Sequence, residues 1–308
     1  MQVQEIQQSL AGLRLGSPQV HLNLALFPLV GADAAAPGYL LLDDALERNL
    51  ARVTEVSSAG RVPELAFENS SAQKILLVDG DELVGAKQNR ILNLSILVGG
   101  GKKLTIPVSC VEQGRWSYRG RDFQPARRSL FAKARAKKMQ SVSHALRSSG
   151  ERRSNQSEVW ADVADKAASC RVESQTGSMS DIYEKRARDL DAYVAAFRAE
   201  PRQRGAVVAI DGKVSGLELF DSSAAFDRYL PKLTRSYALD AIETSTGKAL
   251  APSGAEVRRF VDALCAAAGE RFEALGEGED IRLTGEGVAG GALAVGGRVV
   301  HLAGFAVA

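Results

Sequence analysis

Two polar segments separated by an apolar stretch constrain the fold of this chain more than any other feature. The first segment is residues 85–90 (GAKQNR), and the second is residues 109–116 (SCVEQGRW). Residues 91–98 partly alternate apolar and polar side chains, three glycines follow, and residues 102–108 continue as a second apolar run. A period of two is typical of β-strands. The sequence therefore predicts a hairpin that brings both polar segments to one end of a sheet.

The convergence of these segments would gather unlike functional groups in one small volume. Such a volume is a candidate site, because many different polar groups are hard to satisfy by structural contacts alone. A buried polar network that only stabilises the hairpin is the alternative. The candidate residues are Lys87, Gln88, Asn89, Arg90, Cys110, Glu112, Gln113, Arg115 and Trp116.

Each type of side chain suggests a role in this site. Lys87 and Arg90 can hold phosphate oxygens, lysine as a point charge and arginine as a two-pronged donor. The three amide side chains can bind an amide, a ribose or the edge of a base. Trp116 can stack on a base or cover the core.

Two of the candidates are possible reactive groups. Glu112 can act as a general base, or it can be the structural partner of Arg90 or Arg115. Cys110 is the candidate nucleophile if basic neighbours lower its pKa, whereas a cysteine on a buried strand is inert.

Length and composition limit the class of protein. A chain of 308 residues with 45% hydrophobic and 25% charged residues is ordinary for a soluble globular protein. No apolar run approaches the roughly 20 residues that span a bilayer. Residues 1–15 lack the pattern of a signal peptide and predict a short amphipathic helix. Three cysteines far apart in sequence indicate a reducing compartment, so we expect a cytoplasmic protein.

The charge is unevenly distributed along the chain. Residues 115–153 contain twelve basic and two acidic residues, a net charge of +10, which leaves −8 for the rest of the chain. Such a cationic stretch can concentrate an anionic ligand or bind nucleic acid. It can equally be a solvated connection. Residues 119–128 are the nearest thing to a linker.

The order of predicted elements indicates an α+β fold in which residues 1–308 form one domain. The N-terminal part is strand-rich, residues 129–200 form a helical insertion, and C-terminal strands and helices complete the same sheet system. The predicted strands are residues 21–30, 39–42, 51–56, 65–68, 74–78, 205–210, 213–220, 288–295 and 298–307. The predicted helices are residues 130–146, a helix capped by Ser154 or Asn155, one capped by Ser180-Asp181 through Phe197, residues 222–244 interrupted near Pro231, and residues 253–268. Asp43-Asp44 predicts a further helix cap.

Familiar cofactor motifs are weak or missing. Residues 285–290 have the spacing of a dinucleotide-binding glycine loop, but a strand follows where a helix is required. The three histidines are isolated and no Cys-x-x-Cys occurs, so no zinc site is expected. Carboxylates can still hold magnesium, and the cofactor stays open.

Several segments resemble a bacterial family, named as the ADP-ribosylglycohydrolase and rhodanese-phosphatase-superfamily-associated protein domain, from about residue 20 to the end. The name implies an association with enzymes that process ADP-ribose. The resemblance also suggests further site residues: Asp211, Lys213 and Glu218 on one hairpin, Gln156 and Trp160 one helical turn apart, and Ser174, Thr176 and Ser178 on a polar turn. The resembling segments are residues 85–90, 106–116, 154–160, 209–213, 216–220 and 285–291.

The sequence therefore predicts a protein that binds a phosphorylated nucleoside metabolite, ADP-ribose or a relative. The expected chemistry is hydrolysis or group transfer, with Glu112 or Asp211 as the base. One alternative is a sensor that binds the same ligand without turnover. The other is a nucleic-acid-binding protein that uses residues 115–153. No membrane partner is expected, and the sequence leaves the oligomeric state open.

Overall fold

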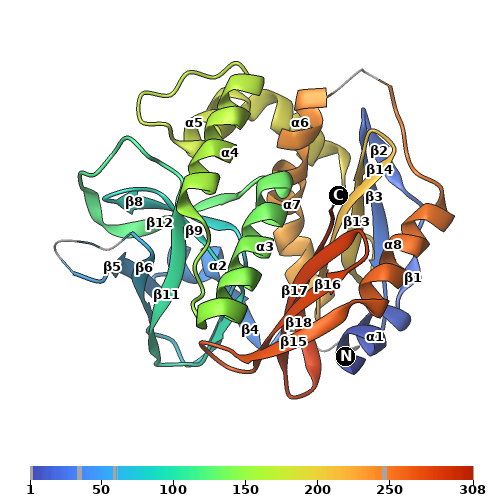
Figure 1. Cartoon of the computed structure of the whole chain (residues 1–308), viewed down its shortest axis with the longest axis horizontal. Helices are drawn as coiled ribbons and strands as arrows, with labels where there is room; N and C mark the ends of the chain where they lie inside the picture. Colours follow the sequence, from blue (N-terminus) through green and yellow to red (C-terminus); the bar gives the residue numbers. More distant parts are fainter. Residues whose placement is uncertain (1–2, 33–36, 58–59, 61, 245–247, 308) are drawn as a thin grey trace.

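The computed structural model describes residues 3–32, 37–57, 60, 62–244 and 248–307. Within these residues, eight helices and eighteen strands form the predicted α+β fold (Figure 1). A barrel of strands lies on the left in this view and a large sheet on the right. Helix α7 (Ser223–Thr244) packs against strands of both bodies, β12 of the barrel and β13 of the sheet.

The large sheet contains strands from both ends of the chain, as the sequence predicts. All neighbouring strands are antiparallel, in the order β1-β3-β13-β14-β18-β17-β16-β15, with β2 beside β3. Strands β3 and β13 pair along their length, from Leu24 opposite Ile210 to Val30 opposite Gln203. The strands are β1 (Arg14–Leu15), β2 (Gln19–His21), β3 (Leu24–Val30), β13 (Gln203–Ile210), β14 (Lys213–Phe220), β15 (Ala268–Glu273), β16 (Glu279–Gly285), β17 (Val288–Val295) and β18 (Arg298–Ala306).

The hairpin predicted at Asp211-Gly212 joins β13 to β14. Asp211 and Gly212 both have positive φ, 52° and 74°, as a tight two-residue turn requires. Strands β17 and β18 also match their predictions, and the pairing of β16 with β17 replaces any dinucleotide-binding loop at residues 285–290. The sequence did not predict β15, because most of its side chains are exposed and polar.

The second body is a closed barrel with strand order β11-β6-β5-β12-β8-β9. A small sheet of β10, β7 and β4 adjoins it. The barrel strands are β5 (Ala51–Glu55), β6 (Glu64–Asn69), β8 (Asp81–Ala86), β9 (Arg90–Leu92), β11 (Lys103–Cys110) and β12 (Arg119–Ser129), and the others are β4 (Tyr39–Leu41), β7 (Lys74–Leu77) and β10 (Ile96–Val98).

The hairpin predicted for residues 91–98 and 102–108 is wrong in its first strand. This segment divides into β9, which pairs with the end of β11, and β10, which pairs with β7. The chain changes sheets at Asn93 and Ser95. Their side chains bind backbone elsewhere, since Asn93 donates to the Arg152 carbonyl at 3.0 Å and Ser95 accepts from the Asp79 N–H at 3.0 Å.

The linker predicted at residues 119–128 is also wrong, because these residues form most of β12. This strand pairs with β8 and β5 inside the barrel. Two of its basic side chains have carboxylate partners from other elements. Arg128 contacts Glu82 at 3.0 Å, and Arg127 contacts Glu47 at 2.6 Å.

The helical middle is present as predicted, with one helix divided. Helix α4 begins after Asn155, whose side chain accepts from the N–H of Ser157. The helix predicted from Ser180 through Phe197 is two helices, and Ser178 rather than Ser180 caps the first. The helices of this region are α3 (Ala132–Ser149), α4 (Gln156–Ser169), α5 (Met179–Lys185) and α6 (Ala187–Ala196).

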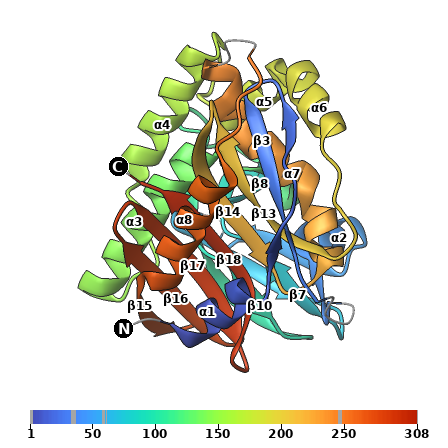
Figure 2. The same cartoon turned by 90° about the vertical axis from the view of Figure 1, so that its right-hand side faces the viewer.

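The remaining helices lie beside the barrel and the large sheet (Figure 2). Helix α7 continues through Pro231, where an interruption was predicted. Pro231 is exposed, so the carbonyl that loses its helical partner can be hydrated. Helix α2 (Leu42–Glu47) begins after Leu41, which places Asp43 and Asp44 in its first turn rather than at its cap. Helices α1 (Gln4–Ala11) and α8 (Gly254–Ala266) cover the outer face of the large sheet.

Candidate functional site

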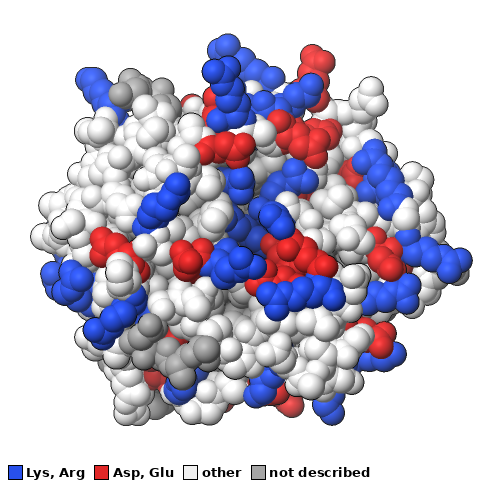
Figure 3. Space-filling model, turned by 180° about the vertical axis from the view of Figure 1, so that it is seen from behind, with Lys and Arg blue, Asp and Glu red and all other residues white. Residues whose placement is uncertain are grey.

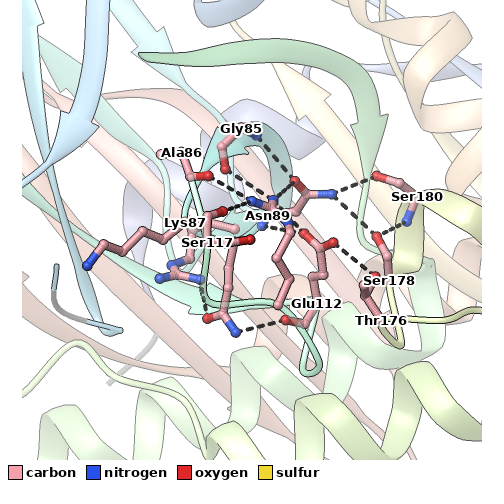
Figure 4. Close-up of polar contacts among 12 residues, drawn as sticks. Gly85, Ala86, Lys87, Asn89, Glu112, Ser117, Thr176, Ser178 and Ser180 are labelled. Carbon is pink, nitrogen blue, oxygen red and sulfur yellow. Dashed lines mark hydrogen bonds and ion pairs between the residues drawn. The ribbon is translucent and has the colours of Figure 1, made fainter. Parts of the chain in front are cut away.

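The two polar segments meet where β8, β9 and β11 end (Figure 4). The Gln88 side chain donates to the carbonyl of Glu112 at 2.9 Å, and the N–H of Asn89 donates to Glu112 Oε2 at 3.1 Å. The pairing of Arg90 with Cys110 in the barrel brings the segments together. The geometric expectation from the sequence is therefore met, although through a shorter strand pair than predicted.

Two glycines allow other parts of the chain to approach the two polar segments closely. A Cβ on Gly85 would lie 2.8 Å from the carbonyl oxygen of Asp122, and its φ of 134° is unfavourable for other residues. A Cβ on Gly114 would lie 3.0 Å from Thr176, on the loop before α5. A side chain at Gly85 would clash with Asp122, and one at Gly114 would clash with Thr176.

Glu112 and Arg115 form the buried centre of the network. Arg115 Nη2 lies 2.6 Å from Glu112 Oε2, and it also donates to the Gly85 carbonyl at 3.3 Å. Burial acts to raise the pKa of Glu112, but hydrogen bonds from Arg115, the Asn89 N–H and Thr176 outweigh it and lower the pKa. Glu112 is therefore ionised, and both of its oxygens already accept hydrogen bonds within the network.

A second layer of polar groups supports this centre. Asn89 donates to the hydroxyls of Ser178 and Ser180 at 3.3 and 3.0 Å, and Ser180 donates to Glu82 at 2.9 Å. Ser174 accepts from the N–H of Ser178 at 2.8 Å and so shapes the same loop. Ser178 and Ser180 are buried, whereas Ser174 is half-buried, at the edge of the network.

Arg90 differs from Arg115 because two of its three guanidinium nitrogens lack a partner among the described residues, whereas only Nε of Arg115 does. The side chain is fully buried, and Nη1 donates to Gln88 Oε1 at 2.8 Å. Nε and Nη2, the two nitrogens of one edge, have no hydrogen-bond partner among the described residues. Burial lowers the pKa of Arg90, while Cys110 and Glu55 act against that change. An edge with two adjacent N–H donors matches two oxygens of one phosphate or carboxylate group.

Exposed aromatic side chains cover the buried cations Arg90 and Lys87. The Trp116 ring lies 5.6 Å from Arg90 Cζ and 5.1 Å from Lys87 Nζ, and the Tyr118 ring lies 5.2 Å from Lys87 Nζ. Trp116 and Tyr118 are 47% and 50% exposed, so each has ring surface available to a ligand. The Lys87 side chain extends away from the buried network (Figure 4).

Glu55, at the end of β5, is a site residue that the sequence did not reveal. Its Oε1 accepts from the N–H of Lys87 at 3.3 Å, while Oε2 is buried with no partner among the described residues. Glu55 and Tyr118 also line a surface hollow of about 740 Å³, together with Arg52, Thr54, Ser57, Gly120 and Arg121. The hollow thus reaches the carboxylate next to Arg90. Only the chain register of the barrel places Glu55 here, and no motif in the sequence signals it.

Cys110 faces the interior of the site. Its thiol donates to Gln88 Oε1 at 3.1 Å, and its backbone is fixed by Gln156, which accepts from the Cys110 N–H and donates to its carbonyl, both at 2.8 Å. Burial raises the pKa of Cys110, although Arg90, the Glu112 N–H and Trp160 act to lower it. The neutral thiol is therefore favoured, and the thiolate needed for nucleophilic attack is not.

The remaining predicted site residues divide into two groups. Thr176 donates to Glu112 at 2.9 Å and so belongs to the network, whereas Gln113 is exposed and contributes its backbone carbonyl. Asp211 and Lys213 line a different hollow of about 660 Å³, and Asp211 accepts from Asn23 at 3.0 Å. Glu218 is buried in the large sheet, where it contacts Arg135 at 2.9 Å and His301 at 2.8 Å. No hydrogen bond or ion pair between described residues joins these three to the central site, so the structure does not bring them together with it.

The cationic stretch is mostly neutralised by carboxylates in the folded chain. Beyond the pairs of Arg127 and Arg128, Arg135 and Lys138 are buried beside Glu218 and Asp79. Arg147 contacts Glu270 at 2.5 Å. The sequence could not show this, because each partner lies far away along the chain.

The described residues also bear on metal binding and on membranes. Within them, no group of three or more His, Cys, Asp or Glu side chains is arranged to hold a metal ion. No helix in the described part of the chain combines the length and apolar character needed to cross a membrane.

The chain matches a family of known proteins. The family described as the ARG and Rhodanese-Phosphatase-superfamily-associated Protein domain matches residues 12–305. This range covers nearly the whole chain and confirms the resemblance found in the sequence. No curated protein and no solved structure matches.

Proposed function

Since this chain belongs to the family of the ARG and Rhodanese-Phosphatase-superfamily-associated Protein domain, we propose that it binds a phosphorylated nucleoside metabolite of the ADP-ribose class. The ligand enters through the hollow beside Glu55 and Tyr118. Its phosphate groups bind Arg90 and Lys87, and its base stacks on the exposed ring of Trp116 or Tyr118.

The unpaired edge of Arg90 is the observation that carries this proposal. A buried donor without a partner costs about 1–3 kcal/mol, and more when the group is charged. Arg115, in the same network, shows that these segments can surround a guanidinium with acceptors, since its terminal nitrogens make five hydrogen bonds. The two unpartnered donors of Arg90 destabilise the ligand-free protein, and a bound oxyanion would remove this cost.

The other groups at the mouth fit the rest of such a ligand. The unpartnered Oε2 of Glu55 can accept a ribose hydroxyl. The indole of Trp116 lies over Arg90, so a ligand that reaches the free edge must displace or slide beneath this ring. The volume of the hollow, about 740 Å³, accommodates a ligand that consists of a nucleoside, two phosphate groups and a second ribose.

Catalysis, if the bound ligand is hydrolysed or transferred, depends on Glu55 rather than on Glu112. Glu55 has an oxygen available next to the cation and beside the hollow, whereas the Glu112 oxygens are occupied. A base must reach the proton that it removes. The same occupation of Glu112, together with the neutral Cys110 thiol, favours a second candidate function, a sensor that binds the ligand without converting it.

Intrinsic fluorescence offers a direct test, because both tryptophans of the chain, Trp116 and Trp160, belong to the site. ADP-ribose, NAD and AMP are titrated against the wild type, Arg90→Met and Lys87→Ala. Lys103→Ala is the matched control, since Lys103 lies at the opposite end of β11 and is 72% exposed. We expect a change in emission with wild type and control, and at least a tenfold weaker affinity for the two site variants.

The absence of any response to the three ligands, in fluorescence and in calorimetry, would refute the proposed ligand class. Product analysis by chromatography over several hours then separates the enzyme from the sensor. Glu55→Gln should bind ADP-ribose and form no product if Glu55 is the base. An unchanged mixture with wild-type protein selects the sensor.

A further inference from the structure

A second charged hollow lies between helices α2 and α7, away from the proposed nucleotide site. Figure 3 shows acidic and basic side chains gathered around a hollow near the middle of this face. The cavity measures about 220 Å³, and Leu41 and Pro231 supply its apolar wall. Its charged lining residues are Asp43, Asp44, Glu47, Arg127, Arg228, Lys232 and Arg235.

The floor of this hollow has more negative than positive charge. Lys232 Nζ lies 2.7 Å from Asp43 Oδ2 and 3.0 Å from Asp81 Oδ1. The hydroxyl of Tyr229 donates to the same Asp81 oxygen at 2.9 Å. Two carboxylates thus share one ammonium group, which leaves one negative charge in a buried position.

One oxygen on the floor is also unused. Asp43 Oδ1 is buried and has no hydrogen-bond partner among the described residues. A buried carboxylate oxygen without a donor is costly, and a neutral donor would satisfy the oxygen but leave the charge. A cationic donor satisfies both.

The rim presents hydrogen-bond donors instead. Arg228 pairs with Asp44, Arg127 with Glu47, and Arg235 with Asp191 at 2.7 Å. Each of these guanidinium groups has five N–H donors, so each retains donors after binding its carboxylate. The rim can therefore bind an anionic group while the floor binds a cationic one.

We propose that the hollow between α2 and α7 binds a small zwitterion, a primary ammonium compound that carries a carboxylate, as amino acids do. The ammonium group donates to Asp43 Oδ1 at the floor, and the carboxylate accepts from Arg228 and Arg235 at the rim. The volume of the cavity limits the ligand to roughly the size of an amino acid.

The charge on the floor also gives the pH dependence of binding. Burial raises the pKa of Asp81 to about 6; Lys232 on α7 acts to lower it, Asp43 on α2 acts to raise it, and the Tyr229 hydroxyl acts to lower it. Below this pH, Asp81 is protonated and Lys232 neutralises Asp43. The ammonium group then loses the charge that attracts it, so the affinity at pH 5 should be lower than at pH 7.5.

Ligand-observed NMR on the full chain tests the proposal with glycine, β-alanine and 4-aminobutyrate, which place the two charges progressively further apart. Methylammonium, acetate and potassium ions are the single-charge controls. The variants are Asp43→Asn at the floor, Arg228→Met at the rim and Asp189→Asn as a matched surface control. Arg228 is 60% exposed, so its replacement tests the rim even if Asp43→Asn fails to fold.

We expect at least one zwitterion to bind wild type and Asp189→Asn, with at least a tenfold weaker affinity for Asp43→Asn and a several-fold weaker affinity for Arg228→Met. The proposal is overturned if no zwitterion binds wild type at 50 mM, a generous concentration for a weak site of about millimolar affinity. It is also overturned if methylammonium or potassium binds as tightly as the best zwitterion, or if the affinity is the same in Arg228→Met.

Discussion

Replacing Arg90 or Arg115 by methionine should affect stability in very different ways, although both arginines are buried in the same network. Methionine keeps a long flexible side chain and removes the guanidinium. Arg90→Met loses one hydrogen bond, to Gln88, whose Oε1 still accepts from the Cys110 thiol. Arg115→Met loses contacts with five acceptors and leaves Glu112 as a buried carboxylate without its cation.

The magnitudes follow from this difference. A hydrogen bond to a charged group contributes about 1.5–3 kcal/mol, and each unpaired buried donor costs about 1–3 kcal/mol. For Arg90 the lost hydrogen bond is offset by removal of two unpaired donors, so the free energy of unfolding should fall by no more than about 1 kcal/mol, or should rise. For Arg115, breaking a buried ion pair should lower it by about 3–5 kcal/mol.

Urea denaturation followed by far-ultraviolet circular dichroism measures both values. Fluorescence is unsuitable here, because Trp116 lies over Arg90 and would report the substitution itself. If Arg90→Met loses as much stability as Arg115→Met, Arg90 is a structural cation. The reasoning that assigns its free edge to a ligand would then fail.

Three further predictions follow from the site. Trp116→Ala should weaken ADP-ribose binding about 5- to 160-fold through lost stacking of roughly 1–3 kcal/mol, with little change in stability because the ring is half exposed; equal calorimetric affinities would exclude stacking on Trp116. Glu112→Gln should cost about 3–5 kcal/mol near neutral pH. Since the folded pKa of Glu112 is lowered, its contribution is present above the unfolded value of about 4.3 and is lost as the pH falls through the folded value; a difference from wild type that does not shrink in acid would contradict this. Iodoacetamide at pH 8 should modify the partly exposed Cys265 before the buried Cys110, as peptide mass spectrometry can show, and equal rates would mean that Cys110 is accessible.

The sequence predicted the parts of this fold that depend on local patterns. Asp211-Gly212 signals a tight turn whatever surrounds it, and Asn155 caps α4 through its own neighbour Ser157. The convergence of the two polar segments was also predictable, because the apolar runs between them required pairing. The strand registers were harder to predict, because one apolar run divides into β9 and β10, which belong to different sheets.

Features that depend on distant partners could not be predicted. Residues 119–128 read as a linker because their charges lacked visible partners, and the carboxylates that neutralise them come from other elements. Glu55 joins the site only through closure of the barrel. The difference between Arg90 and Arg115 is a matter of which acceptors face each guanidinium, and residue identity carries no information about that.

The pairing of β3 with β13 has a consequence for how such a protein can be built. Val30 lies opposite Gln203, and the N–H of Gly31 donates to the carbonyl of Arg202 at 3.2 Å. The chain therefore leaves the large sheet after β3 and returns to it at the start of β13. The barrel and the helical region are thus an insertion between two adjacent strands of this sheet. Because the two ends of the insertion already touch, the large sheet continues across it, but buried ion pairs such as Arg135–Glu218 and Lys232–Asp81 join the inserted part to the rest of the chain, so we expect the two parts to fold as one unit.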